Sequence, residues 1–178
     1  MKEKTSLVKL STVGLENAFN VFQLSDGSLV HVTIVDTAGQ EKYRALSDRY
    51  YRKADGCLLV YDITDKRTFE EMEGYFYTQL KEKCKKNIKV IVLGNKTDLE
   101  ENRKVSREEG ADFAQEKGYM FMETSCKNTR TVADSFETLI ELTYAEFLEK
   151  GGIVPEKSSI TINKANATAK NDNSGCPC

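Results

Sequence analysis

The stretch Val30–Glu41, which reads VHVTIVDTAGQE, decides how this chain folds. Apolar side chains stand at every second position from Val30 to Ile34, the period of a β-strand with one buried face. The strand runs into Asp36, and a glycine turn follows. An acid at the carboxyl end of a strand, followed by such a turn, is typical of a site for a metal ion and a phosphate. The alternative is an ordinary strand and turn that combine these residues by chance.

Three residues of this turn can supply the chemistry of such a site. Asp36 can hold Mg²⁺ through a water molecule. Gly39 lets a backbone N–H approach a phosphate because it has no Cβ. Gln40 can orient an attacking water molecule, which makes it the candidate catalytic residue.

The composition indicates a soluble globular protein with one domain. The chain has 178 residues, of which 30% are charged, and its formal net charge is −2. This balance gives no basis for binding nucleic acid. The sequence has no run of 18 apolar residues and no signal-peptide core, so we expect no membrane-spanning helix. Three cysteines lie far apart in the sequence, a distribution that is typical of reduced thiols in a cytosolic protein; they are Cys57, Cys84 and Cys126.

The order of the expected elements indicates an α/β fold, with a mostly parallel sheet and flanking helices. A hairpin is expected where Asp26-Gly27 joins residues 19–24 to the strand that ends at Asp36. Continuous apolar runs predict strands that are buried on both faces. These strands cover residues 56–62 and 88–93, with a shorter one over residues 119–123. Apolar residues that recur every three or four positions predict helices over residues 69–80, 106–118 and 132–148. A capping box of Ser106 and Glu109 marks the start of the second of these helices.

The first residues of the chain allow two interpretations. Lys4 and Thr5 match the last two positions of the phosphate-binding motif G-x-x-x-x-G-K-[ST], whose helix would begin here. Lys4 and Thr5 would then contact phosphate, and Thr5 would bind Mg²⁺. However, Glu3 stands in place of the glycine, and the chain contains no Gly-Lys pair. The other interpretation is a solvated N-terminal tail.

A base-recognition site is predicted where Asn95-Lys96-Thr97-Asp98 follows a strand. Guanine presents two adjacent donors, and the ionised carboxylate of Asp98 can accept both. Adenine offers neither donor and would leave the carboxylate unpaired, a mismatch that can discriminate by roughly 10⁴ or more. Asn95 can brace the loop or contact the base, and the aliphatic stem of Lys96 can cover the base and sugar.

A second loop, Ser125-Cys126-Lys127, follows the next expected strand. It resembles the Ser-Ala-Lys loop of guanine-nucleotide-binding proteins, in which a backbone N–H reaches the guanine O6 atom. Cys126 in place of alanine leaves that backbone donor unchanged. The alternative for both loops is an ordinary polar connection after each strand.

From Thr12 to Phe147 the motifs and their order resemble a Rab-type small GTPase of the Ras superfamily. The runs Tyr50-Tyr51-Arg52 and Leu58–Asp62 agree with this resemblance, as does a C-x-C end. The resemblance implies a switch for membrane traffic that binds GTP and GDP with Mg²⁺ and hydrolyses GTP. It also implies that Thr12 is the switch I threonine, a ligand of Mg²⁺ and of the nucleotide.

The resemblance further implies that residues 1–150 form a small G-domain whose first strand and P-loop are largely missing. That strand would lie between the strand ending at Asp36 and the one beginning near Gly56. We therefore expect two unpaired strand edges and poor nucleotide binding. Val35 replaces the family's tryptophan, and Asn17 replaces a hydrophobic residue of the effector surface.

The last segment, residues 151–178, is expected to be a disordered tail, since it is rich in Ser, Thr, Asn and Lys and has no aromatic residue. It ends in Cys176 and Cys178, which resemble the doubly prenylated C-x-C end of Rabs. The resemblance implies recognition by the prenylation machinery and by Rab effectors. It also implies a location on the cytoplasmic face of an intracellular membrane, with a cytosolic pool.

Two alternatives to a working switch remain open. One is another function, that of a prenylated pseudo-GTPase, a binding module that has no nucleotide cycle. The other is that the chain is a truncated gene model.

Overall fold

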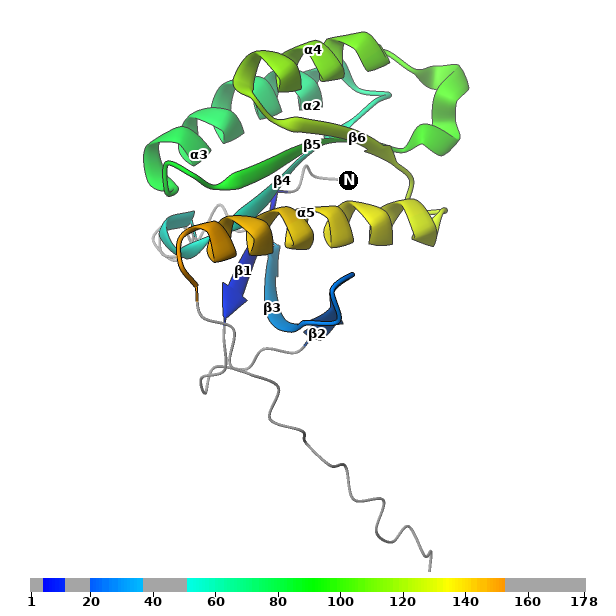
Figure 1. Cartoon of the computed structure of the whole chain (residues 1–178). Coiled ribbons are helices and arrows are strands. Elements are labelled where there is room, and N and C mark those ends of the chain that lie inside the picture. The colour runs from blue at the N-terminus through cyan, green and yellow to red at the C-terminus, as the bar shows by residue number, and fades with distance from the viewer. Residues whose placement is uncertain (1–4, 12–19, 37–50, 153–178) are drawn as a thin grey trace, which may run out of the picture.

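The computed structural model describes residues 5–11, 20–36 and 51–152 (Figure 1). These residues form a sheet with helices on both of its faces. The strands are β1 (Thr5–Ser11), β2 (Asn20–Gln23), β3 (Leu29–Asp36), β4 (Gly56–Asp62), β5 (Lys89–Asn95) and β6 (Met120–Thr124). The helical segments are α2 (Lys66–Glu71), η2 (Met72–Phe76), α3 (Tyr77–Lys83), η3 (Thr97–Asn102), α4 (Arg107–Lys117) and α5 (Thr129–Glu149).

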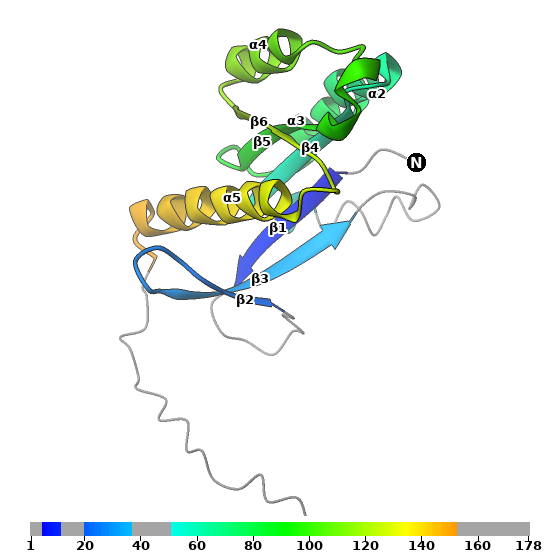
Figure 2. The ribbon, with the colours of Figure 1, turned by 90° about the vertical axis from the view of Figure 1, so that its right-hand side faces the viewer.

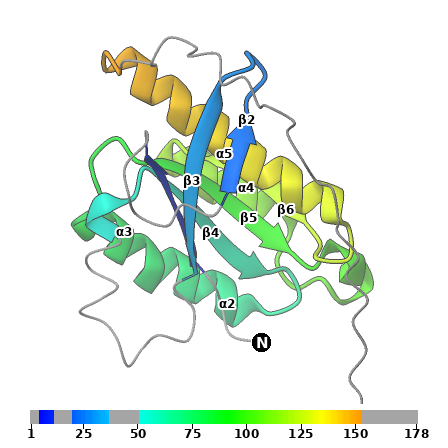
Figure 3. The same ribbon diagram turned by 90° about the horizontal axis from the view of Figure 1, so that it is seen from below.

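The six strands of the described sheet lie in the order β2-β3-β1-β4-β5-β6. β4, β5 and β6 pair in parallel, and β3 points the same way as they do. The mostly parallel α/β fold expected from the sequence is thereby confirmed. The predicted hairpin is also present, with β2 and β3 side by side (Figure 3). Gly27 has a φ of 82° in its turn, a conformation that glycine adopts without strain.

The central position of the sheet is occupied, contrary to expectation. β1 pairs with β3 from Ser6, opposite Asp36, to Ser11, opposite His31. On its other side it pairs with β4, with Thr5 opposite Leu59. The prediction that two strand edges would be left unpaired is therefore wrong. The sequence predicted that a loop ends and a helix begins at Lys4-Thr5. This is wrong for Thr5, which is the first residue of strand β1.

β1 runs antiparallel to both of its neighbours, β3 and β4. Because β2 is also antiparallel to β3, β1 and β2 point the same way on opposite sides of β3. In this position β1 satisfies the backbone donors and acceptors of β3 and β4.

The core has one part on each face of the sheet. On one face, Leu59, Tyr61 and Val92 are buried with residues of α2, α3 and α4. On the other face, Leu58 and Ile91 are buried beneath α5 (Figure 2). Side chains of neighbouring positions in β4 and β5 therefore enter opposite parts of the core, which is why both strands read as continuous apolar runs.

The helices begin and end where local signals predict. α4 has the expected capping box between Ser106 and Glu109, and it stops at Gly118, whose φ is 70°. α5 begins after Asn128, whose side chain accepts a hydrogen bond from the Arg130 N–H. Within the described chain, no helix is both long enough and apolar enough to cross a membrane.

Candidate functional site

The candidate site lies at the edge of the sheet where the parallel strands end. Asp62, Asn95 and Thr124 are the last residues of β4, β5 and β6, and the strand register places them side by side. In α/β sheets this edge is where ligands bind, because loops and helix starts surround it. The Asn95–Asp98 and Ser125–Lys127 loops both start here, so the sheet brings together the two predicted base-recognition segments.

Asp98 is held by the second of these loops. Ser125 Oγ donates to Asp98 Oδ1 at 2.5 Å, and Lys127 Nζ lies 2.7 Å from Asp98 Oδ2. The Lys127 backbone N–H in turn donates to Ser125 Oγ at 3.1 Å. The hydrogen bonds from Lys127 and Ser125 lower the pKa of Asp98 from its ordinary value. The carboxylate is therefore ionised near neutral pH and can act only as a hydrogen-bond acceptor.

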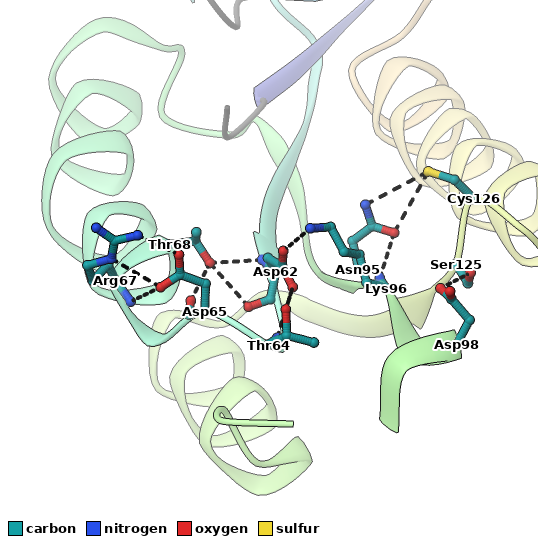
Figure 4. Close-up of polar contacts among 10 residues, drawn as sticks. All are labelled: Asp62, Thr64, Asp65, Arg67, Thr68, Asn95, Lys96, Asp98, Ser125 and Cys126. Atoms are coloured by element: carbon teal, nitrogen blue, oxygen red, sulfur yellow. Dashed lines mark hydrogen bonds and ion pairs between the residues drawn. The ribbon is translucent and has the colours of Figure 1, made fainter. Parts of the chain in front are cut away.

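Lys96 joins the site to the end of β4. Its Nζ forms an ion pair with Asp62, whose carboxylate also accepts from the N–H and hydroxyl of Thr64 at 2.8 and 2.7 Å (Figure 4). Burial alone would raise the pKa of Asp62, but the hydrogen bonds from Lys96 and Thr64 outweigh it and lower the pKa. Lys96 also has a φ of 71°, a costly left-handed conformation for a residue with a side chain.

Asn95 connects the same two loops from the side of β5. Its Oδ1 accepts from the Lys96 N–H at 2.8 Å, which fixes the start of the turn. Its side chain lies 3.9 Å from the sulfur of Cys126, at the length of a weak sulfur hydrogen bond (Figure 4). Cys126 is exposed and, like Cys57 and Cys84, is a free thiol.

The predicted phosphate and metal residues are only partly covered by the structure. Thr5 begins β1 and Asp36 ends β3, so the backbone brings both to the edge that carries the base-recognition loops. Lys4, Thr12, Gly39 and Gln40 lie outside the described residues, as do Cys176 and Cys178.

The strand register bears on the predicted Mg²⁺ ligands. Ser11, the residue before Thr12, pairs with His31, whereas Asp36 is five positions further along β3. At about 3.4 Å per residue, Ser11 lies roughly 17 Å along the sheet from Asp36. The described backbone brings Thr5 and Asp36 to one edge, and Thr12, the third predicted Mg²⁺ ligand, lies outside the described residues. The described part of the chain also has no cluster of three or more His, Cys, Asp or Glu residues that could hold a metal ion.

Sequence reasoning missed two parts of this site. No role in the site was predicted for Asp62 from the sequence, although Asp62, like Asp36, is the acidic residue that ends a strand. Arg103, which follows η3, was not singled out at all. Its guanidinium contacts both Glu100 and Glu123, and only its spacing of three residues from Glu100 could have signalled a partner.

Known proteins match nearly the whole chain. A family model described as "Ras family" matches residues 1–145. The Ras-related protein Rab2BV of Beta vulgaris is 38% identical over 172 aligned residues, and the alignment covers 93% of this chain and 79% of that protein. The Ras-related protein Rab11C of Lotus japonicus is 37% identical over 175 residues, with the same two shares. The Ras-related protein RABA4b of Arabidopsis thaliana is 36% identical over 171 residues, which are 96% of this chain and 69% of that protein.

Proposed function

The chain belongs to the Ras family and is a Rab-type small GTPase by its relatives, and from this premise we propose that it is a guanine-nucleotide switch for membrane traffic. In this proposal the base subsite is intact and the phosphate site is weak. Asp98 accepts the two adjacent donors of guanine, the backbone N–H of Cys126 donates to its O6 atom, and the stem of Lys96 covers the ring.

The observation that carries the proposal is the contact of Asp98 with Ser125 and Lys127. Residues 27 positions apart in the chain meet through one carboxylate, which is held ionised at the ligand-binding edge of the sheet. Lys127 Nζ now occupies an oxygen of this carboxylate, and a bound guanine would take over that oxygen. Nothing in an ordinary pair of polar loops requires this arrangement.

Competition for labelled GDP tests base recognition. Unlabelled GTP should displace the label at far lower concentration than ATP or XTP. Asp98→Asn should shift the preference toward xanthine nucleotides, because the amide supplies a donor where xanthine has its 2-oxo acceptor. Asp134→Asn, which removes an exposed carboxylate paired with Arg130 on α5, is the matched control and should not change the preference. Equal competition by ATP would exclude a guanine site.

Phosphate binding and hydrolysis are expected to be weak. When bound, Mg²⁺ would neutralise charge on the phosphates, with Thr5, Thr12 and Asp36 as its proposed ligands. Gln40 would orient the attacking water molecule, and Lys4 and Gly39 would contact phosphate. Nucleotide released from purified, denatured protein should therefore be well below one equivalent. Near-stoichiometric GDP, with turnover that Gln40→Leu abolishes, would contradict this expectation.

The second candidate is a pseudo-GTPase that binds partners without a nucleotide cycle. The start of β1 favours it, because Thr5, the last residue of the predicted phosphate-binding motif, begins a strand and not the helix that follows this motif in nucleotide-binding sites. Partner binding that does not change when GDP is replaced by a non-hydrolysable GTP analogue would support this candidate over the switch.

Membrane attachment is proposed to use Cys176 and Cys178. A single lipid chain anchors a protein weakly, and stable attachment takes two signals, so both cysteines are expected to be prenylated. The prenylation machinery would be a partner, and the attached protein would face the cytoplasm, with a cytosolic pool. Mass spectrometry of the C-terminal peptide from the membrane fraction tests this, and an unmodified peptide there would refute it.

A further inference from the structure

Two segments carry the side chains of the base subsite, and a second contact joins them beside Asp98 and Ser125. Asp98 lies in η3, and Ser125 follows β6. Glu100 stands two residues after Asp98 in η3, and Glu123 stands two residues before Ser125 in β6. Each segment therefore offers two points of contact to the other. Asp98 and Ser125 form one, and Glu100 and Glu123 stand where a second can form.

Arg103 makes this second connection. Its Nε and Nη2 donate to the two carboxylate oxygens of Glu100 at 2.7 and 2.6 Å, which is a bidentate fork. Its Nη1 donates to Glu123 Oε1 at 2.8 Å and to the carbonyl oxygen of Val105 at 3.1 Å. One guanidinium therefore holds η3, the residues after it and the end of β6 in a fixed relation.

Burial strengthens the contact between Arg103 and Glu123. The side chain of Arg103 is 16% exposed and that of Glu123 is 12% exposed, whereas Glu100 is 63% exposed. A mostly buried charge that loses its partner is costly, so Arg103 and Glu123 cannot separate cheaply. A lysine could not replace the arginine, because its ammonium is a single point charge and cannot form a fork with one carboxylate while bonding another.

We infer that Arg103 is a positioning residue for guanine recognition, which sets the distance between Asp98 and Ser125 by joining Glu100 to Glu123. This inference rests on the proposed guanine site. Arg103 does not contact the base. It acts by holding the two loops that do. Its loss loosens the loop that presents Asp98, so the carboxylate no longer meets both guanine donors at once.

The test compares Arg103→Gln with Arg107→Gln. Arg107 lies 3.8 Å from the same Glu123 but is 69% exposed, so it is a matched control for the loss of a charge beside that glutamate. Affinities are measured for GDP and for IDP, which lacks the 2-amino donor. We expect Arg103→Gln to reduce the GDP-to-IDP affinity ratio by about tenfold and Arg107→Gln to leave it unchanged. A folded Arg103→Gln variant with an unchanged ratio overturns the inference.

A second readout needs no nucleotide. In the unmodified full chain, NMR titration of the Asp98 carboxyl group should show a lowered pKa, because Lys127 and Ser125 hold its charged form. In Arg103→Gln this pKa should move up toward about 3.9, the ordinary value for aspartate, and in Arg107→Gln it should not move. If the full chain binds no guanine nucleotide, the proposed function fails, and this titration still decides the role of Arg103.

Two further variants guard against a simple loss of folding. Glu123→Gln breaks the same connection from the side of β6 and should change the Asp98 titration in the same direction. Combined with Arg103→Gln it should add little, because both changes remove one interaction. Fully additive effects would overturn the inference. If Arg103→Gln does not fold, Arg103→Lys keeps the charge and should still raise the pKa of Asp98, and a wild-type titration in that variant overturns the inference.

Discussion

At the scale of single residues, the core contains a polar atom without a partner. Tyr61 is 1% exposed, and its hydroxyl has no hydrogen-bond partner among the described residues. Burial, followed by the nearby charge of Glu123, raises the pKa of Tyr61 well above its ordinary value. A buried hydroxyl without a partner costs free energy, because it has lost its hydrogen bonds to water.

Tyr61→Phe is therefore expected to raise the free energy of unfolding by about 1 kcal/mol. Tyr144→Phe is the matched control, because the Tyr144 hydroxyl has a partner in Ser28 Oγ at 3.1 Å. That variant should lower the free energy of unfolding by about 0.5–1.5 kcal/mol. Urea unfolding of the three proteins measures both changes, and a loss of stability in Tyr61→Phe would show that its hydroxyl has a partner.

The residue scale also shows which parts of the site the sequence could predict. Asp98 and Ser125 were predictable because each belongs to a short motif at the end of a strand, and the sheet brings such ends together. The pairing of Lys96 with Asp62 was not predictable, because it depends on how two strands lie in register 34 positions apart in the chain. Arg103 was missed for the same reason, since Glu123 is 20 residues away.

At the scale of elements, α4 is fitted to the sheet through Gly110. An added Cβ at Gly110 would lie 2.3 Å from the Tyr61 hydroxyl oxygen and 2.6 Å from a ring carbon of Phe121. Glycine weakens a helix interior, so its presence here reflects the close approach of α4 to these rings.

Gly110→Ala is expected to destabilise the protein by about 1–3 kcal/mol, because overpacking outweighs the better helix propensity of alanine. Gly74→Ala is the control, since an added Cβ there has no atom within 4 Å. It should stabilise the protein by about 0.5–1 kcal/mol. Adding Tyr61→Phe to Gly110→Ala removes the nearest clashing atom and should recover part of the loss. Strictly additive thermal-unfolding results would contradict this coupling.

Glu146 joins α5 to the start of β5 and gives the fold a defined response to acid. Lys150 Nζ and Lys89 Nζ each lie 2.8 Å from its carboxylate, and Asn87 Nδ2 donates to it at 3.2 Å. The hydrogen bonds from Lys150, Lys89 and Asn87 lower the pKa of Glu146 from 4.5 to about 2. The unfolded chain therefore takes up this proton at higher pH than the folded one, so the stabilisation is present above pH 4.5 and is lost toward pH 2.

Glu146→Gln should be less stable than the parent chain above pH 4.5, and the difference should shrink as the pH falls toward 2. Glu149→Gln, which changes an exposed residue of the same helix, is measured beside it as the control for the loss of one carboxylate. Urea unfolding at a series of pH values measures the difference. A difference between Glu146→Gln and the parent that stays constant down to pH 2.5 would contradict the role of this contact.

The element scale separates the predictable part of the fold from the rest. Local signals made four elements predictable, namely β4, β5, α4 and α5. These signals are the spacing of apolar residues, the capping box and the glycine that ends a helix. β1 was not, because its seven residues carry no turn or cap that fixes a direction. Its place depends on partners 20 or more residues away in the chain.

At the scale of the whole molecule, β1 joins two parts of the sheet. β2 and β3 lie on one side of it and β4, β5 and β6 on the other, and β3 has no direct pairing with β4. We therefore expect that deleting residues 1–11 separates the sheet into two parts and exposes the edges of β3 and β4.

The deletion should abolish the single cooperative unfolding transition and promote aggregation, because unpaired strand edges pair with other chains. Differential scanning calorimetry and light scattering measure these effects. Deleting residues 153–178, which follow the last described residue, Gly152, is the control and should leave the transition in place. One sharp transition after removal of residues 1–11 would show that β3 and β4 can pair directly.

The central position of β1 has a practical consequence for protein engineering. Since a single connection, residues 12–19, joins this strand to the described strands that follow it, β1 can be supplied on a separate peptide by cutting that connection. Cutting the chain between residues 11 and 20 would yield a short fragment and a long one that recover a common sheet only when they meet. Fused to two other proteins, such fragments would report by their reassembly that those proteins are close together.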